Sequence, residues 1–187
     1  MRIYQNIGDG DVDIISDGYK MTKPEGFEGI VTEVVSRMVV KGGENIDIGC
    51  GNAFGGKNED DEEGGAGGQD EVEKVNDLID AFQYAETAMD KDQFKGWLKE
   101  YGKKIVEKLP KEDGDRFKKG FQLFAKKILS SFAEFTFYTP SDYSMEGTII
   151  MSFWRNEEDP APTFWFLLDG LKMIKVWLFA IIFKYRI

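Results

Sequence analysis

The clearest pattern of apolar and polar positions in the chain lies between residues 90 and 110. Apolar side chains recur there at steps of three and four, at Phe94, Trp97, Leu98, Tyr101, Ile105 and Leu109. Such spacing places them on one face of a helix, with the lysines on the opposite face. Asp90 followed by Gln93 fits a capping box, and Pro110 marks the end of the predicted helix.

A second helical pattern follows the segment KEDGD (111–115), which is predicted to turn the chain. Its apolar residues share one side of a helix: Phe117, Phe121, Phe124, Ile128, Leu129, Phe132 and Phe135. Two long amphipathic helices with a short link form an antiparallel helical hairpin. We therefore predict such a hairpin over residues 90–135.

Strand patterns lie on both sides of this hairpin. Before it come the short segment RIYQNI and the β-branched run 29–40, which predicts one or two strands. After it come TFYT (136–139), GTIIMSFW (147–154) and TFWFLL (163–168), and Asp169-Gly170 then predicts a β-hairpin turn into LKMIKV. Strands at both ends and helices between them predict an α+β fold rather than a doubly wound sheet.

Glycine and acidic residues dominate the segment 41–70, which contains GGKNEDDEEGGAGGQD. No periodic apolar pattern occurs in it, and this composition is typical of a disordered loop. The segment is also far longer than the usual connection between elements. We predict a mobile acidic loop here, inside a single domain that spans residues 1–176.

The composition narrows the chemistry that the chain can perform. Its 187 residues are 42% hydrophobic, enough for the core of one domain, and they include no histidine and a single cysteine, Cys50. These counts exclude His-ligated metal sites, Ser-His and Cys-His catalytic pairs, and an internal disulfide. They favour a reducing compartment, and the first residues show no secretory signal.

The net charge of −10 argues against nucleic acid as a general partner. The charge is unevenly distributed, because residues 91–127 hold twelve Lys and Arg against six Asp and Glu. That segment carries +6 and the rest of the chain −16. The asymmetry predicts either a basic element on an acidic body or two solvated helix faces.

The sequence IDIGCGNAFGG (46–56) matches the glycine pattern that opens the adenosylmethionine site of many methyltransferases. Such a loop binds its cofactor because it joins a strand to a helix. Here the glycines precede KNEDDEEGGAGG, which cannot start a packed helix, and no second parallel strand follows. A degenerate adenosylmethionine-dependent methyltransferase is kept as the alternative function.

Two acidic clusters contain the oxygen ligands that Ca²⁺ prefers. The segment DGDVDIISDGYK (9–20) begins like an EF-hand loop, but Ile14 and Lys20 stand where that loop needs Gly and Glu. It is therefore not an EF-hand. The second cluster offers oxygen ligands for a weak Ca²⁺ site, and its alternative is a solvated acidic loop. Its members are Asp60, Asp61, Glu62 and Glu63.

Taken in order, five segments resemble the translationally controlled tumour protein family. They are MRIYQNI…DIISDGY, GGENIDIGCGNAFGG, VNDLIDAFQYAETAMDKDQFKGWLKEYGKKI, FAEFTFYTPSDYSMEGTIIMSFW and PTFWFLLDGLKM. The second and fourth are similar to the two signatures of that family, with departures at Phe54, Gly56 and Pro140-Ser141. Asp142 stands beside the last departure as a substitute acid.

The resemblance implies a non-enzymatic cytoplasmic protein that requires no cofactor. Its fold would be a tent of strands like that of a Rab-binding chaperone, with the helical hairpin projecting from it. The family is associated with Ca²⁺ binding, microtubule association, growth and survival control, and binding of small GTPases of the Rheb class. An adaptor is the function that these associations imply.

The resemblance also implies positions for partner contacts. An acid in the N-terminal turn, Asp13, and its counterpart after the helical hairpin, Asp142, would flank a groove that contacts a GTPase. Basic residues of the hairpin would meet the acidic surface of tubulin, chiefly Lys95, Lys99, Lys103 and Lys119, with Lys91, Lys118, Lys126 and Lys127 beside them. The alternatives are ordinary turn acids and solvated helix faces.

An apolar C-terminal extension, residues 177–187, lies outside the family pattern. With Leu171–Ile174 included it approaches fifteen apolar residues, short of the roughly twenty that cross a bilayer. It also lacks the polar face of an interfacial helix. A further strand or an exposed adhesive segment is predicted, without stable membrane insertion.

Overall fold

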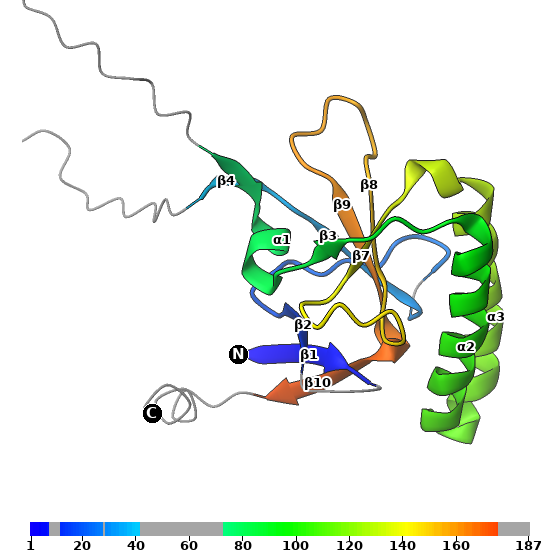
Figure 1. Ribbon diagram of the computed structural model, residues 1–187. Helices are drawn as coiled ribbons and strands as arrows, with labels where there is room; N and C mark the ends of the chain where they lie inside the picture. Colours follow the sequence, from blue (N-terminus) through cyan, green and yellow to red (C-terminus); the bar gives the residue numbers. More distant parts are fainter. Residues whose placement is uncertain (8–11, 28, 42–72, 176–187) are drawn as a thin grey trace, which may run out of the picture.

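The computed structural model describes residues 1–7, 12–27, 29–41 and 73–175, and Figure 1 shows their arrangement. In chain order the elements are β1 (Arg2–Asn6), β2 (Asp13–Ser16), β3 (Val31–Val35), β4 (Met38–Val40), β5 (Lys74–Asn76), α1 (Asp77–Phe82), β6 (Ala85–Glu86), α2 (Lys91–Lys108), α3 (Lys111–Ser130), β7 (Thr136–Thr139), β8 (Ile150–Phe153), β9 (Thr163–Leu167) and β10 (Leu171–Lys175). Short 3₁₀ turns cover Phe132–Glu134 and Leu168–Gly170. The predicted α+β fold is confirmed.

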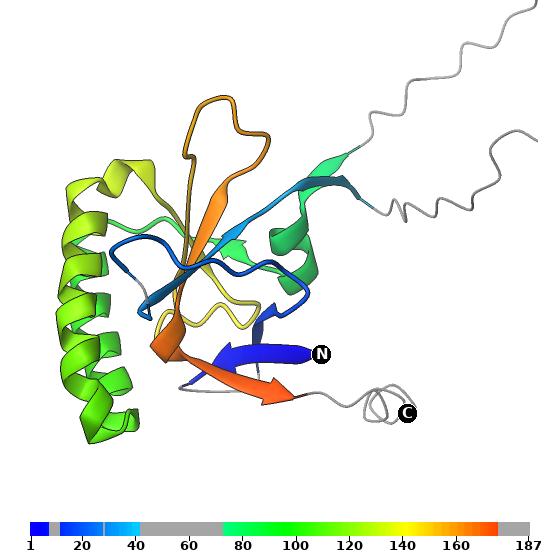
Figure 2. The same ribbon diagram turned by 180° about the vertical axis from the view of Figure 1, so that it is seen from behind.

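The described strands form three antiparallel sheets that build the predicted tent-like body. The largest has the order β3-β9-β8-β7-β6, a second has the order β10-β1-β2, and β4 pairs with β5 in a two-stranded ribbon. In the second sheet Arg2 lies opposite Lys175 and Asn6 opposite Leu171. Segments far apart in the sequence therefore lie side by side, as both ribbon views show (Figures 1 and 2).

The predicted first helix and its capping box are confirmed. Asp90 Oδ1 accepts hydrogen bonds from the main-chain N–H groups of Asp92 at 2.9 Å and Gln93 at 2.7 Å. The Asp90 N–H donates in turn to Gln93 Oε1 at 2.9 Å. This reciprocal arrangement satisfies donors that the first turn of a helix otherwise leaves unpaired. Helix α2 then ends at Lys108, just before Pro110.

The second helix is confirmed with corrected bounds. The predicted turn at 111–115 is wrong, because Pro110 is the N-cap of α3 and these residues form its first turn. Proline fixes φ and needs no amide partner, so a helix can start directly after it. The helix ends at Ser130 rather than Phe135, and a 3₁₀ turn leads from it to β7.

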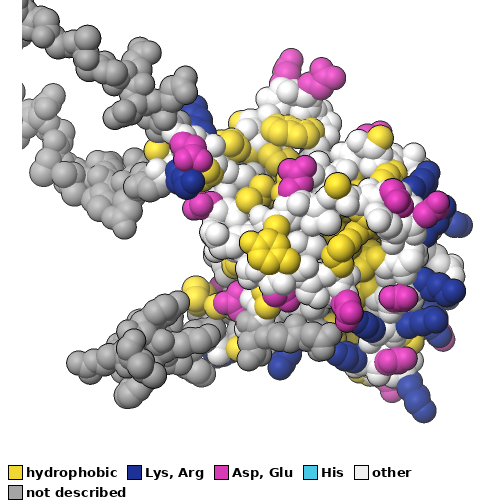
Figure 3. All heavy atoms as spheres, viewed as in Figure 1, with side chains coloured by type: hydrophobic (Ala, Val, Ile, Leu, Met, Phe, Trp, Pro, Cys, Tyr) yellow, Lys and Arg dark blue, Asp and Glu magenta, His cyan; other side chains and the backbone are white. Residues whose placement is uncertain are grey.

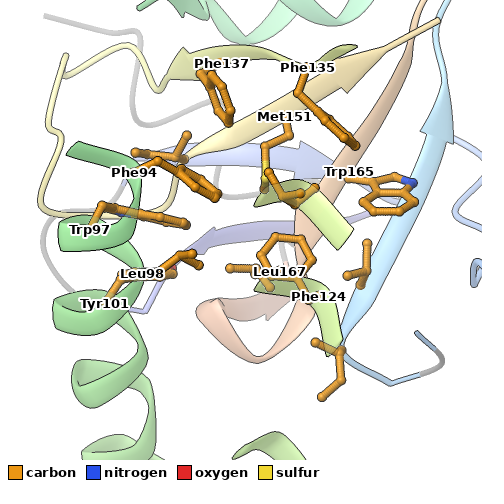
Figure 4. Close-up of a cluster of buried hydrophobic side chains, with 14 of the residues drawn as sticks. Phe94, Trp97, Leu98, Tyr101, Phe124, Phe135, Phe137, Met151, Trp165 and Leu167 are labelled. Atoms are coloured by element: carbon orange, nitrogen blue, oxygen red, sulfur yellow. The ribbon is translucent and has the colours of Figure 1, made fainter. Parts of the chain in front are cut away.

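The core lies on both faces of the five-stranded sheet, because side chains alternate along β9. Trp165 and Leu167 face α2 and α3, whereas Phe164 and Phe166 face β2 and α1. Figure 4 shows the cluster under the helical hairpin, where the labelled side chains are Phe94, Trp97, Leu98, Tyr101, Phe124, Phe135, Phe137, Met151, Trp165 and Leu167. Both helices therefore use their apolar faces to cover the sheet.

The predicted β-hairpin at Asp169-Gly170 is wrong. β9 and β10 belong to different sheets, and the 3₁₀ turn between them carries the chain from one to the other. A two-residue hairpin turn of the predicted kind needs positive φ, and neither Asp169 nor Gly170 has it. Gly170 serves a different need, since a Cβ atom there would lie only 2.2 Å from Tyr101 Oη.

Both helices of the hairpin form hydrogen bonds with this turn. From α3, Arg116 Nη2 donates to Asp169 Oδ1 at 2.7 Å, and Nη1 donates to the Gly29 carbonyl at 2.5 Å. From α2, the Tyr101 hydroxyl donates to the Gly170 carbonyl at 3.3 Å. Burial raises the pKa of the Asp169 carboxyl, partly offset by Arg116, and the Arg116–Asp169 hydrogen bond raises the pKa of the guanidinium.

Two predictions fall on residues outside the described ranges. They concern most of the acidic loop 41–70 and the apolar extension 177–187. The predicted mobility of the loop, the role of the extension and the domain limits therefore stay predictions. Within the described residues, no helix combines the length and apolar character that crossing a membrane requires.

Gly170→Ala should destabilise the protein by about 1–3 kcal/mol, because the new methyl group overlaps the Tyr101 hydroxyl. Gly96→Ala is the matched control: nothing lies within 4 Å of its Cβ position in α2, and it should be neutral or stabilising by up to about 1 kcal/mol. Urea unfolding measures both. In a Tyr101→Phe background Gly170→Ala should cost less, and an equal cost in both backgrounds would contradict the assigned overlap.

Stability should fall steeply in alkali, partly because of Tyr101. Burial raises the pKa of Tyr101 to about 12, whereas the pKa of a tyrosine in the unfolded chain is about 10. The stabilisation that follows from this pKa difference is therefore fully present in the free energy of unfolding below a pH of about 10. It is lost as the pH rises to about 12. The slope of unfolding free energy against pH in that window should be shallower for Tyr101→Phe than for the wild type. Identical slopes would show that Tyr101 is not responsible.

Candidate partner-binding surfaces

A six-residue helix, α1, positions the first candidate surface. Its N-cap is Asn76, whose Oδ1 accepts from the N–H groups of Leu78 at 3.1 Å and Ile79 at 3.3 Å. Asn76 Nδ2 also donates to Ser36 Oγ at 2.7 Å, and this bond anchors the helix to the segment between β3 and β4. Leu78 is buried, and Gln83 ends the helix in a left-handed conformation with φ of 54°.

A hollow of about 380 Å³ lies between β2, α1 and the loop after β7. Its lining consists of Val12, Asp13, Ala81, Phe82, Gln83 and Ser141. The predicted turn position of Asp13 is wrong, because this residue begins β2, where its Oδ1 accepts from Gln5 Nε2 at 2.7 Å. The carboxylate is nevertheless exposed, so a partner can reach it.

Asp142 lies in the loop after β7, next to the wall of the same hollow. Its Oδ1 accepts from the Ser144 N–H at 3.1 Å. Tyr143 adopts φ of 56°, and its side chain is 73% exposed. The structure therefore brings Asp13 and the Asp142 loop to one hollow, although Ser141 rather than Asp142 contributes to its wall.

The segment beside this hollow is held in place by Tyr84. Its hydroxyl donates to the Ile14 carbonyl, which links the end of α1 to β2. Its ring stacks on Phe82 with centroids 5.9 Å apart. Burial raises the pKa of Tyr84 well above its usual value, so the hydroxyl stays protonated and remains a donor. Tyr84 thus links two walls of the hollow, in which the Asp13 carboxylate is exposed.

Sequence patterns did not identify Phe82, Gln83 or Ser141 as members of this hollow. One signal for the helix that carries the first two was present, because Asn followed by acidic residues in a first turn is typical of a helix start. The position of Ser141 beside it results from sheet pairing between β6 and β7. That pairing has no local signature.

The second candidate surface is the helical hairpin. Lys95, Lys99 and Lys103 follow one another at steps of four along α2 and are exposed. Lys99 and Lys103 lie beside a groove of about 400 Å³ between α2 and α3, together with Lys118 of α3. Lys119 is exposed but is not part of that groove.

The groove is apolar at its base. Leu98, Val106, Phe117 and Phe121 line it, and a Cβ atom at Gly102 would lie 2.7 Å from Phe121 Cε1, so the glycine lets the two helices approach. Figure 3 shows Lys and Arg side chains gathered on this side of the molecule, over α2 and α3. The predicted basic element is thus a real surface feature, although Lys95 is paired with Asp92 at 2.8 Å.

The proposed metal and cofactor residues cannot be placed in the same way. Asp60, Asp61, Glu62, Glu63 and the glycine segment 46–56 lie outside the described residues. Within residues 1–7, 12–27, 29–41 and 73–175, no group of three or more His, Cys, Asp or Glu side chains is arranged to hold a metal ion.

Comparison with known proteins gives one consistent result. The family model described as translationally controlled tumour protein matches residues 1–172. A translationally-controlled tumor protein homolog of Kluyveromyces lactis is 32% identical over 179 residues, covering 94% of this chain and 100% of that protein. A homolog of the same name from Plasmodium chabaudi chabaudi is 32% identical over 177 residues, covering 91% and 97%.

A solved structure supports the same relationship at the level of the fold. The translationally controlled tumor-associated protein of Schizosaccharomyces pombe is similar to this chain with a TM-score of 0.69 and 29% sequence identity. The likeness covers 94% of this chain and 100% of that one. Sequence and structure comparisons therefore agree over nearly the full length.

Proposed function

The chain belongs to the translationally controlled tumour protein family, and we propose from that membership that it is a cytoplasmic adaptor in growth and survival control. It contacts a small GTPase of the Rheb class through the hollow that contains Asp13, and microtubules through the lysines of the helical hairpin. Weak Ca²⁺ binding by Asp60, Asp61, Glu62 and Glu63 belongs to the same proposal.

The prediction that the chain is not an enzyme is confirmed by its family. Proteins of this family are not known as enzymes, and the relatives described above carry the family name. None of these matches supports the adenosylmethionine-dependent methyltransferase that the glycine segment suggested.

One observation carries the proposal of a GTPase surface. Asp13 lines a hollow whose wall also contains Ser141, the residue before Asp142, so acids from distant parts of the chain lie in and next to one concave surface. Val12 and Phe82 add apolar area to its wall. Carboxylates with adjacent apolar area suit contact with a basic patch of a GTPase, or with the surroundings of its Mg²⁺ ion.

Asp13→Ala combined with Asp142→Ala should weaken binding of a Rheb-class GTPase by about tenfold or more, measured by calorimetry. Glu157→Ala with Glu158→Ala on the loop between β8 and β9 is the matched control, since it removes the same charge elsewhere and should leave affinity unchanged. Asp13 and Asp142 are both exposed, so replacing them should change the free energy of unfolding by less than about 0.5 kcal/mol. Unchanged affinity of the first variant would refute this surface.

The microtubule surface rests on the exposed lysines of the hairpin. Changing Lys95, Lys99, Lys103 and Lys119 to Gln should abolish most co-sedimentation with microtubules, and added salt should weaken the wild type because exposed charges are screened beyond about 8 Å at physiological salt. Gln at the exposed lysines Lys23, Lys41, Lys74 and Lys172, outside the hairpin, is the control of equal charge. Salt-independent binding, or equal loss in both variants, would count against this surface.

A further inference from the structure

A second hollow, of about 350 Å³, lies where β3 meets the loop between β8 and β9. We call it the basic hollow and define it by three cationic residues, Lys20, Arg37 and Arg155, with Glu33 among them. The three cationic residues are exposed, whereas the Glu33 side chain is only 6% exposed. The hollow belongs neither to the Asp13 surface nor to the hairpin lysines.

The Glu33 carboxylate accepts hydrogen bonds from three side chains, of which Trp165 is buried and Thr22 and Arg155 are exposed. Its Oε2 accepts from Trp165 Nε1 at 2.8 Å, and its Oε1 accepts from Thr22 Oγ1 at 3.3 Å and from Arg155 Nη2. A buried carboxylate needs such partners because desolvation of an unpaired charge is costly. Its charge is therefore satisfied from within the fold, and one side of the Arg155 guanidinium is held in a fixed position.

The pairing of β3 with β9 places the Glu33 side chain on the same buried face of the sheet as Trp165. β3 is an edge strand of the five-stranded sheet, and Glu33 lies opposite Trp165 on β9. Thr22 closes the free edge at this point, with two main-chain hydrogen bonds to Glu33 of 2.8 Å each. Figure 2 shows the segment that contains Thr22 running across β3.

Within the described residues, neither of the other two cations, Lys20 and Arg37, forms a salt bridge. The Arg37 main chain is fixed, because its N–H donates to Asp77 Oδ1 at 2.9 Å. The lining thus has three positive charges and one negative charge, a net +2. The acids Glu157 and Glu158 follow Arg155 in the same loop but do not line the hollow.

Apolar side chains continue from the edge of the hollow. Val35, part of its lining, is 56% exposed, and the three residues of β4, Met38, Val39 and Val40, are 43%, 38% and 43% exposed. Free phosphate or nucleic acid would leave this apolar strip uncovered. A polypeptide whose acidic and apolar side chains lie two positions apart would cover both features, since side chains at i and i+2 of an extended segment point in the same direction.

We propose that the basic hollow binds a carboxylate side chain from an acidic, partly apolar segment of a protein partner. Arg155, oriented by Glu33, supplies the planar donor group that suits a carboxylate, and Lys20 and Arg37 close around it as further cations. Val35 and β4 pack against the apolar residues that flank the acid. This site is independent of the GTPase and microtubule surfaces proposed above.

The test uses ¹⁵N-labelled full-length protein and a short peptide of Glu-Ser-Leu-Ser repeats, which places Glu and Leu on one face, with the Gln-Ser-Leu-Ser peptide as its neutral counterpart. The acidic peptide should shift the amide signals of residues around Lys20, Arg37 and Arg155, and the neutral one should not. Lys20→Glu with Arg37→Glu should weaken the acidic peptide by about tenfold or more. Lys111→Glu with Lys172→Glu, an equal charge change at exposed positions elsewhere, should leave binding within about twofold.

Three results would overturn the proposal: equal shifts with both peptides, equal weakening in both variants, or shifts with inorganic phosphate that the acidic peptide does not compete away. The first two would mean that no specific carboxylate contact exists, and the third would mean a small-anion site. Asp13→Ala with Asp142→Ala should bind the acidic peptide like the wild type. That result separates failure of this site from failure of the GTPase surface.

Discussion

The fold depends on burying one sheet on both of its faces. β9 runs through the interior of the five-stranded sheet, and all five of its residues are buried. A strand with apolar side chains on both faces needs cover on both. The helical hairpin supplies one cover, and β2 with α1 supplies the other. Trp165 of β9 links the sheet to one of these covers, because its ring packs near Phe124 of α3. Its indole N–H also donates to Glu33 of the neighbouring strand β3.

The same constraint fixes the surfaces available to partners. Each covering element turns one face to the sheet and the opposite face to solvent, so the hairpin presents its lysines and α1 presents the hollow of Asp13. The edge of the sheet cannot be covered in this way. There Glu33 is enclosed by Thr22, Trp165 and Arg155, and the cations around it remain outside. Three charged surfaces therefore occupy separate parts of one fold.

The two long helices and several strands, among them β7 at its predicted residues 136–139, could be predicted from the sequence, whereas the shortest elements could not. Helices α2 and α3 repeat their apolar steps over 18 and 20 residues, which suffices to define a period. β5, α1 and β6 have three, six and two residues, and their formation depends on tertiary contacts such as that of Asn76 with Ser36. Gly170 was misinterpreted as a hairpin glycine because its real requirement, the nearby Tyr101 hydroxyl, comes from a distant helix. Asp13 and Asp142 were predicted from the family resemblance. The resemblance indicates where the acids stand in the sequence, but not the residues that line the hollow beside them.

The pairing of β1 with β10 has a consequence for synthesis on the ribosome. β1 is made before the helical hairpin, yet its partner residues 171–175 emerge only after the hairpin and the strands of the five-stranded sheet have been translated. Pairings of such high sequence separation form slowly, and strand edges exposed meanwhile invite association with other chains. The nascent chain therefore carries an incomplete three-stranded sheet through most of translation, and β1 with β2 is the part that most needs protection by a chaperone.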